Sequence, residues 1–207
     1  MQLNYRPALE LAQRTLSTLD PSIVAERSGA ELLDSDAGQE LRLSLLGREY
    51  RVPLRDGLVY DAASASPAAV STTLVVLHYL VTADGSPISR EWIAFRSLPG
   101  GAIYEQAFRQ QCLDPLAAAF GHCPEELRAA AERLGGVEAG MGDLSYIFHP
   151  LPRLPMACVL WLADEELGAE ANLLYDATAP HYLPTEDLAA VGRMVAFGLI
   201  RFQGRKR

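Results

Sequence analysis

The sequence is poor in cysteine and lacks the short motifs that mark common catalytic classes. Its three cysteines, Cys112, Cys123 and Cys158, form no CxxC pair and leave an odd thiol. This pattern argues against a secreted disulfide framework and against a zinc or iron–sulfur site held by cysteine. The sequence also contains no Walker loop, GxGxxG fingerprint, HExxH pair or GxSxG elbow. Motifs therefore leave the cofactor unknown and give hydrolase chemistry no positive support, and we expect a reducing, cytoplasmic location.

A basic surface and a long apolar run are missing as well. Twenty-six acidic residues against 18 basic ones give a net charge of −8 and a pI near 5.0, the wrong sign for a protein that holds nucleic acid on a broad basic face. The longest apolar stretch, 73–81, is far shorter than the ~20 residues of a membrane span, and no leader-like pattern opens the sequence. We therefore expect neither nucleic acid nor membrane as a partner.

The composition is that of a globular domain. Of the 207 residues, 49% are apolar and 21% are charged, and a chain of this length can bury most of its surface in one core. Helical spacing of apolar residues predicts helices at 7–19, 22–27, 67–81, 102–113, 115–121, 124–135 and 185–202. Alternation predicts a β-hairpin at 40–54, and short apolar segments predict strands at 91–96, 143–148, 157–163 and 171–175.

These elements do not alternate regularly between strand and helix, which favours an α+β fold over a doubly wound one. We predict a single α+β domain over residues 1–207, with a mixed or antiparallel sheet. Helix 67–81 is apolar nearly all round, as expected of a buried central helix. Helix 185–202 has one apolar stripe and is predicted to dock on the domain, with Thr185 as its N-cap.

The first candidate site follows strand 91–96, where two glycines join it to a helix. Its candidate ligand-binding residues are Trp92, Arg96, Gly100, Gly101, Tyr104 and Arg109. The glycines would let backbone N–H groups approach an anion, and either arginine would add a bidentate donor. The alternative is a glycine turn with the aromatic side chains packed as core.

The second candidate site is the polar segment from Asp176 to Asp187. His181, Asp176 and Glu186 are the candidate catalytic residues, as an acid–base pair or as oxygen and imidazole ligands, and Tyr182 is a further candidate for ligand binding. The spacing matches no metal motif. The alternatives are that Asp176 stabilises a turn, that Glu186 only interacts favourably with the helix dipole and that His181 is a surface residue.

His78 is the third candidate, because it falls on the apolar stripe of helix 67–81. A buried imidazole needs a hydrogen-bonding partner, and a satisfied core histidine is the plain alternative. Axial ligation of a tetrapyrrole or general-base action would also suit a histidine in such a place.

Several segments resemble an uncharacterised bacterial family, domain of unknown function 3786, over about residues 20–203. They are Arg27-Ser-Gly-Ala30, Leu46-Gly-Arg-Glu-Tyr50, Leu77-His-Tyr-Leu80 with Asp84-Gly85, Trp92-Ile-Ala-Phe-Arg96 with Leu98-Pro-Gly-Gly101, and His181-Tyr-Leu-Pro-Thr-Glu-Asp187. The resemblance implies an anaerobic setting near redox or corrinoid metabolism, because some relatives carry an added iron–sulfur module, which this chain lacks. It implies no catalytic residue.

Three functions are compatible with the sequence. The leading expectation is a protein that binds a small anionic or aromatic ligand, a tetrapyrrole being one candidate. The second is an enzyme in which His181 or His78 acts as acid or base beside Asp176 or Glu186. The third is an accessory subunit whose apolar surface is covered by a protein partner.

Overall fold

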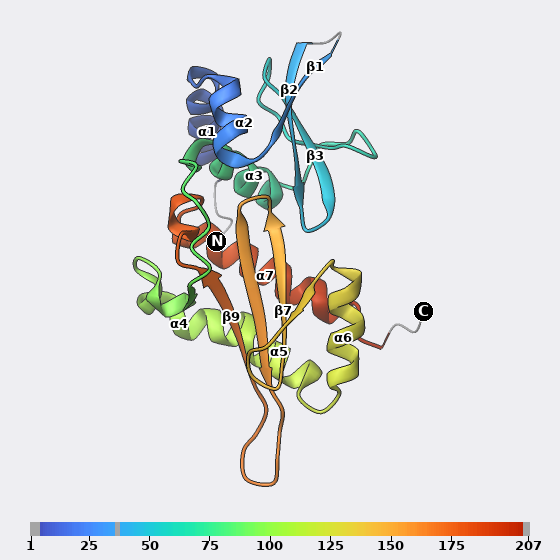
Figure 1. Cartoon of the computed structure of the whole chain (residues 1–207). Helices are drawn as coiled ribbons and strands as arrows, with labels where there is room; N and C mark the ends of the chain where they lie inside the picture. Colours follow the sequence, from blue (N-terminus) through green and yellow to red (C-terminus); the bar gives the residue numbers. More distant parts are fainter. Residues whose placement is uncertain (1–4, 36–37, 205–207) are drawn as a thin grey trace.

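Two antiparallel sheets, rather than one, organise the chain (Figure 1). The computed structural model describes residues 5–35 and 38–204. The N-terminal sheet has the order β1-β2-β3-β4, with β1 at Glu31–Ser35, β2 at Gly38–Leu45, β3 at Arg48–Pro53 and β4 at Tyr60–Asp61. The C-terminal sheet has the order β5-β9-β8-β7-β6, with β5 at Trp92–Ala94, β6 at Val137–Ala139, β7 at Leu144–Leu151, β8 at Leu154–Trp161 and β9 at Glu170–Asp176. The predicted α+β class and antiparallel pairing are confirmed.

The predicted β-hairpin is β2 and β3. The leucines at 41, 43 and 45 are buried while the residues between them are less so, which is the alternation expected of a half-covered strand. Leu46 and Gly47, both with positive φ, form its tight turn. The backbone N–H of Leu46 donates to the carbonyl of Pro150 on β7 at 2.8 Å, so the tip of this hairpin joins the two sheets.

Three helices cover the N-terminal sheet: α1 at Arg6–Thr18, α2 at Pro21–Ser28 and α3 at Val70–Thr82. Six of the 13 residues of α3 are buried, so the prediction of a buried central helix is confirmed. The helix begins at Val70 and not at Pro67, because the segment before it is tied to β4: Tyr60 pairs with Pro67, and Ala68 donates to the carbonyl of Val59.

The predicted break between two helices at Asp114-Pro115 does not occur. α4, at Gly101–Phe108, continues through a π-helical turn at Arg109–Leu113 into α5, at Asp114–Phe120. The backbone N–H of Asp114 donates to the carbonyl of Arg109, five residues back. Pro115 has no N–H to donate and its ring crowds the preceding turn, and the wider π turn accommodates both effects.

The remaining helices are α6 at Pro124–Arg133 and α7 at Thr185–Arg201, and α7 lies behind the C-terminal sheet in Figure 1. The prediction that α7 docks is confirmed, since Leu188, Val191, Val195 and Leu199 are fully buried. Thr185 is not its N-cap. Pro184 occupies that position, and the Thr185 hydroxyl donates to the carbonyl of Pro99 at 2.7 Å.

Within the described ranges, no helix is long and apolar enough to cross a membrane. Cys112 and Cys158 are free and buried, and burial raises the pKa of each thiol to about 12. Both are therefore unreactive core residues at neutral pH.

Candidate functional site

The two segments singled out in the sequence lie side by side. β5 pairs with β9, which places Trp92 opposite Asp176. Further along, the hydrogen bond from Thr185 to Pro99 ties the start of α7 to the loop before α4. The first segment thus supplies α4 and the turn before it, and the second supplies the start of α7, so that both contribute to one surface.

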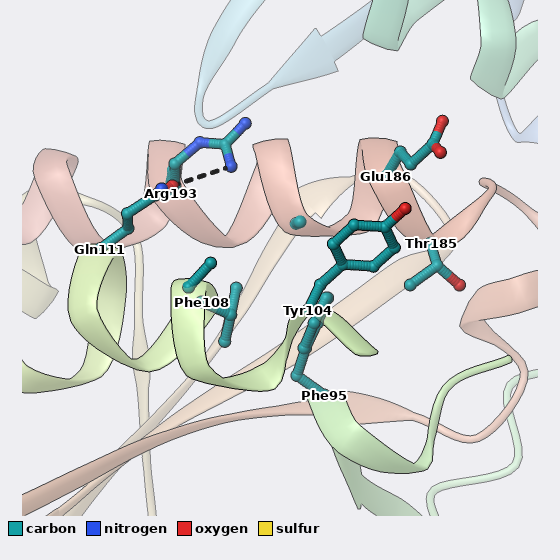
Figure 2. Close-up of a pocket in the computed structure, with 9 residues that line it drawn as sticks. Phe95, Tyr104, Phe108, Gln111, Thr185, Glu186 and Arg193 are labelled. Atoms are coloured by element: carbon teal, nitrogen blue, oxygen red, sulfur yellow. Dashed lines mark hydrogen bonds between the residues drawn. The ribbon is translucent and has the colours of Figure 1, made fainter. Parts of the chain in front are cut away.

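A shallow groove separates α4 from α7 (Figure 2). It consists of two hollows of about 270 and 480 Å³ that share Tyr104, Thr185 and Glu186. The first is lined in addition by Phe95, Ala107, Phe108, Gln111, Ala189 and Arg193, and the second by Pro99, Gly100, Pro180, Leu183 and Pro184. We call this surface the α4–α7 groove.

The floor of the first hollow is aromatic. Phe95 and Phe108 are buried and stacked, with ring centroids 4.1 Å apart and an angle of 12° between the rings. Tyr104 is 50% exposed, and Figure 2 shows its ring standing between the two ends of the hollow. Phe95 and Phe108 therefore form the base of the hollow, and Tyr104 supplies most of its exposed aromatic surface together with a hydroxyl in reach of water.

Opposite charges flank this hollow. Arg193 lies at one end, where its Nη1–H donates to Oε1 of Gln111 at 3.2 Å, and Glu186 lies at the other (Figure 2). Among the residues that the structure describes, neither side chain forms a direct ion pair. One guanidinium N–H of Arg193 is thus used by Gln111, and no ion pair engages the others.

Three of the residues predicted from sequence line the groove: Tyr104, Gly100 and Glu186. Gly100 has φ +74°, a conformation that glycine adopts at no steric cost. Gly101 packs closely, since a Cβ there would lie 2.0 Å from the carbonyl oxygen of Phe95. Its N–H already donates to Leu98 at 2.8 Å, so this donor is not free to bind an anion as we had expected.

The other residues of the first segment lie outside the groove. Arg96 forms an exposed ion pair with Glu105 at 3.8 Å, and Arg109 forms one with Asp114 at 3.6 Å. Trp92 is partly buried on β5 and does not line either hollow. The arginine that does reach the groove, Arg193, comes from α7.

Asp176 is fully buried and saturated with hydrogen bonds. Its carboxylate accepts the backbone N–H and hydroxyl of both Ser89 and Thr178, and the N–H of Arg90 at 2.6 Å. Burial alone would raise the pKa of Asp176, but the hydrogen bonds from Thr178 and Ser89 outweigh it and hold this pKa below its usual value. Residues 83–91, which lead from α3 to β5, are called here the connection between the sheets. Because the Asp176 carboxylate accepts hydrogen bonds from Ser89 and Arg90, it holds this connection against the end of β9.

His181 and Tyr182 bind the same connection. The Nδ1 of His181 lies 2.7 Å from Oδ2 of Asp84, and the hydroxyl of Tyr182, a buried side chain, donates to the carbonyl of Ser86. The hydrogen bond from His181 lowers the pKa of Asp84 to about 2. The structure therefore pairs His181 with Asp84 and not with Asp176 or Glu186, and it buries Tyr182 away from the groove.

His78 is partly buried, and its Nδ1–H donates to Oδ2 of Asp187 on α7 at 2.6 Å. This hydrogen bond raises the pKa of His78 although burial opposes the shift, and the charges of Asp187 and Glu186 raise it further. Like most histidines on an apolar helix, it has a hydrogen-bonding partner. Neither hollow is lined by His78.

Sequence reasoning missed Arg193 and Gln111, which form one end of the groove. Arg193 interrupts the apolar run Val191-Gly-Arg-Met-Val195 of the docking helix. A charged residue inside such a run could have marked Arg193 as a candidate site residue. Gln111 carried none, because only the π turn of 109–113 brings it opposite α7.

Comparison with known proteins identifies the family but no activity. No curated protein and no solved structure matches the chain. Within residues 5–35 and 38–204, no group of three or more His, Cys, Asp or Glu side chains is placed to hold a metal ion. A family model described as a domain of unknown function matches residues 20–197, and the chain therefore belongs to that family, DUF3786.

Proposed function

We propose that the α4–α7 groove binds a small organic anion with a flat, apolar body. The observation that carries this proposal is Arg193, a guanidinium without a carboxylate partner among the described residues, at the end of a hollow with an aromatic floor. A guanidinium binds a carboxylate through two parallel hydrogen bonds, and the rings would hold the body of the ligand.

The dimensions favour a ligand about the size of a substituted benzoate. A hollow of about 270 Å³ lies near the lower end of the range for small-molecule sites. Neither hollow is lined by a histidine or cysteine, so an axial ligand for a tetrapyrrole would have to come from elsewhere. The corrinoid setting stays a prediction of the resemblance and the tetrapyrrole a prediction from the position of His78, and our proposal covers only an organic anion.

The enzyme alternative has less support, because His78 and His181 both lie outside the two hollows and are engaged with carboxylates. Among the described residues, the protein-partner alternative rests on exposed apolar side chains, of which Ile103 and Phe197 are the most exposed on the groove's two helices. Binding of a small molecule therefore remains the function that the groove supports best.

The test is titration of the 15N-labelled protein with 4-ethylbenzoate at neutral pH, followed by NMR and calorimetry. We expect a Kd of about 0.1–3 mM, given the ligand's size, with shifts at Tyr104, Gln111 and Thr185. Arg193→Gln should weaken binding about tenfold or more, because a hydrogen bond to a charged group contributes about 1.5–3 kcal/mol. Arg109→Gln, which removes an exposed guanidinium outside the groove, should leave the Kd unchanged. Equal affinity in wild type and Arg193→Gln would refute the proposal.

A further inference from the structure

The two ends of the groove differ in charge, and both charges come from one helix. Glu186 and Arg193 are seven residues apart on α7, which is two turns, so they project on the same side about 10 Å apart along the axis. That spacing is about one Debye length at physiological ionic strength, so their mutual attraction through water is weak. Glu186 and Arg193 therefore do not neutralise each other, and each charge can interact with a charged group of a ligand.

Glu186 interacts with its surroundings only at longer range, through its charge near His78 and through its place in the first turn of α7. Its neighbour Asp187 is bonded to His78 on α3, and Thr185 uses its hydroxyl on Pro99. In the described part of the chain, no hydrogen bond or ion pair is made by the Glu186 carboxylate, which is exposed at the junction of the two hollows. Figure 2 shows the ring of Tyr104 reaching toward this end. An exposed carboxylate beside an aromatic face suits an ammonium group, which both attract.

We propose that the ligand of the α4–α7 groove is zwitterionic, with its acid group on Arg193, its ammonium group near Glu186 and Tyr104, and an apolar or aromatic spacer over Phe95 and Phe108. This inference rests on the proposed function and names the ligand class for the same site. A ligand that reaches both ends must hold its acid and ammonium groups apart, because the two side chains stand two helical turns apart, and a benzene ring with one methylene is a rigid spacer of this kind. An ordinary α-amino acid, whose charges are adjacent, reaches only one end.

The experiment compares two ligands of nearly the same shape, 4-(aminomethyl)benzoate and 4-ethylbenzoate, by calorimetry at pH 7.5. On the wild-type protein, the zwitterion should bind about tenfold more tightly, because it adds one charge-assisted contact. Glu186→Gln should abolish this preference, so that the two ligands bind the variant with equal Kd. Glu105→Gln, which removes a carboxylate of α4 that pairs with Arg96 outside the groove, is the matched control and should keep the full preference.

The outcomes separate this inference from the proposed function. If 4-ethylbenzoate binds through Arg193 but the zwitterion binds no better, the ligand class is wrong and the anion site stands. A preference that survives Glu186→Gln also overturns the inference, since the ammonium group then lies elsewhere. If neither ligand binds, both proposals fail. Glu186 is exposed, so its replacement should not disturb folding, and unchanged thermal unfolding of Glu186→Gln verifies this.

Discussion

Replacing Asp176 by alanine tests whether this residue holds the two sheets together. The variant removes a carboxylate that is fully buried and accepts five hydrogen bonds from Ser89, Arg90 and Thr178. One bond to a charged acceptor contributes about 1.5–3 kcal/mol, but five bonds to a single group are not additive, since water can reach part of the emptied site. We expect a loss of about 3–5 kcal/mol in the free energy of unfolding.

For a chain of this size, that loss lowers the midpoint of thermal unfolding by about 6–20 °C, at about 2–4 °C per kcal/mol. The assay is thermal and urea unfolding followed by circular dichroism. Asp164→Ala is the matched control, because Asp164 also accepts backbone N–H groups, from Glu166 and Leu167, but is exposed in the β8–β9 loop. A midpoint for Asp176→Ala as close to wild type as that of the control would refute the structural role and return Asp176 to the candidates for catalysis.

Two further predictions concern His78 and Gly101. The pKa of His78 is raised by its hydrogen bond to Asp187, so the pair stabilises the fold fully below the unfolded pKa of about 6.5 and loses this effect as the pH rises through the higher folded pKa. NMR titration of the imidazole should therefore give a pKa above 6.5 that falls in Asp187→Asn; an unchanged pKa in the variant would contradict the assignment. Gly101→Ala should lower the free energy of unfolding by about 2–3 kcal/mol, because its Cβ would meet the carbonyl of Phe95. Gly140→Ala, where a Cβ has open space, should be nearly neutral by urea unfolding, and equal effects of the two would exclude the close contact.

Long, strongly patterned segments were predictable from the sequence. The alternation at Leu41, Leu43 and Leu45 predicted β2, and the nearly continuous apolar residues of 70–82 predicted the buried α3, because burial on one or on all sides leaves a periodicity that is visible without knowledge of the partner. The docking stripe of α7 was visible for the same reason.

Two short edge strands, β1 and β6, were not predicted from the sequence. β1 contains adjacent leucines at 32 and 33, with no alternation, and β6 has only three residues. Both are strands because β2 and β7 offer them a free edge, which is a property of the neighbour and not of the segment. Pro155 hid the start of β8, since proline is uncommon in a central strand. Pro155 is accommodated because it lies opposite the part of β7, between Phe148 and Leu151, where the register shifts. It also precedes Met156, where the pairing of β8 with β9 begins.

The candidate site illustrates the same limit. Polar residues near the ends of elements, such as Asp176 and His181, attract attention in a sequence, yet here they bind the connection between the sheets. At the groove's positive end, Arg193 comes from the regular helix α7 and Gln111 from the π turn before α5, and this turn was not predictable from the sequence.

The contacts of residues 83–91 lie next to the segments from which the two walls of the groove begin. Asp176 ends β9, and β5, which pairs with β9, leads directly into Phe95 and the turn before α4. After His181 and Tyr182 bind the connection, the chain continues within three residues into α7, which carries Glu186 and Arg193. Both walls of the groove therefore start at segments fixed by the Asp176 and His181 contacts. The polar residues that resemble a catalytic set in the sequence thus position the segments from which the aromatic floor and the charged helix begin.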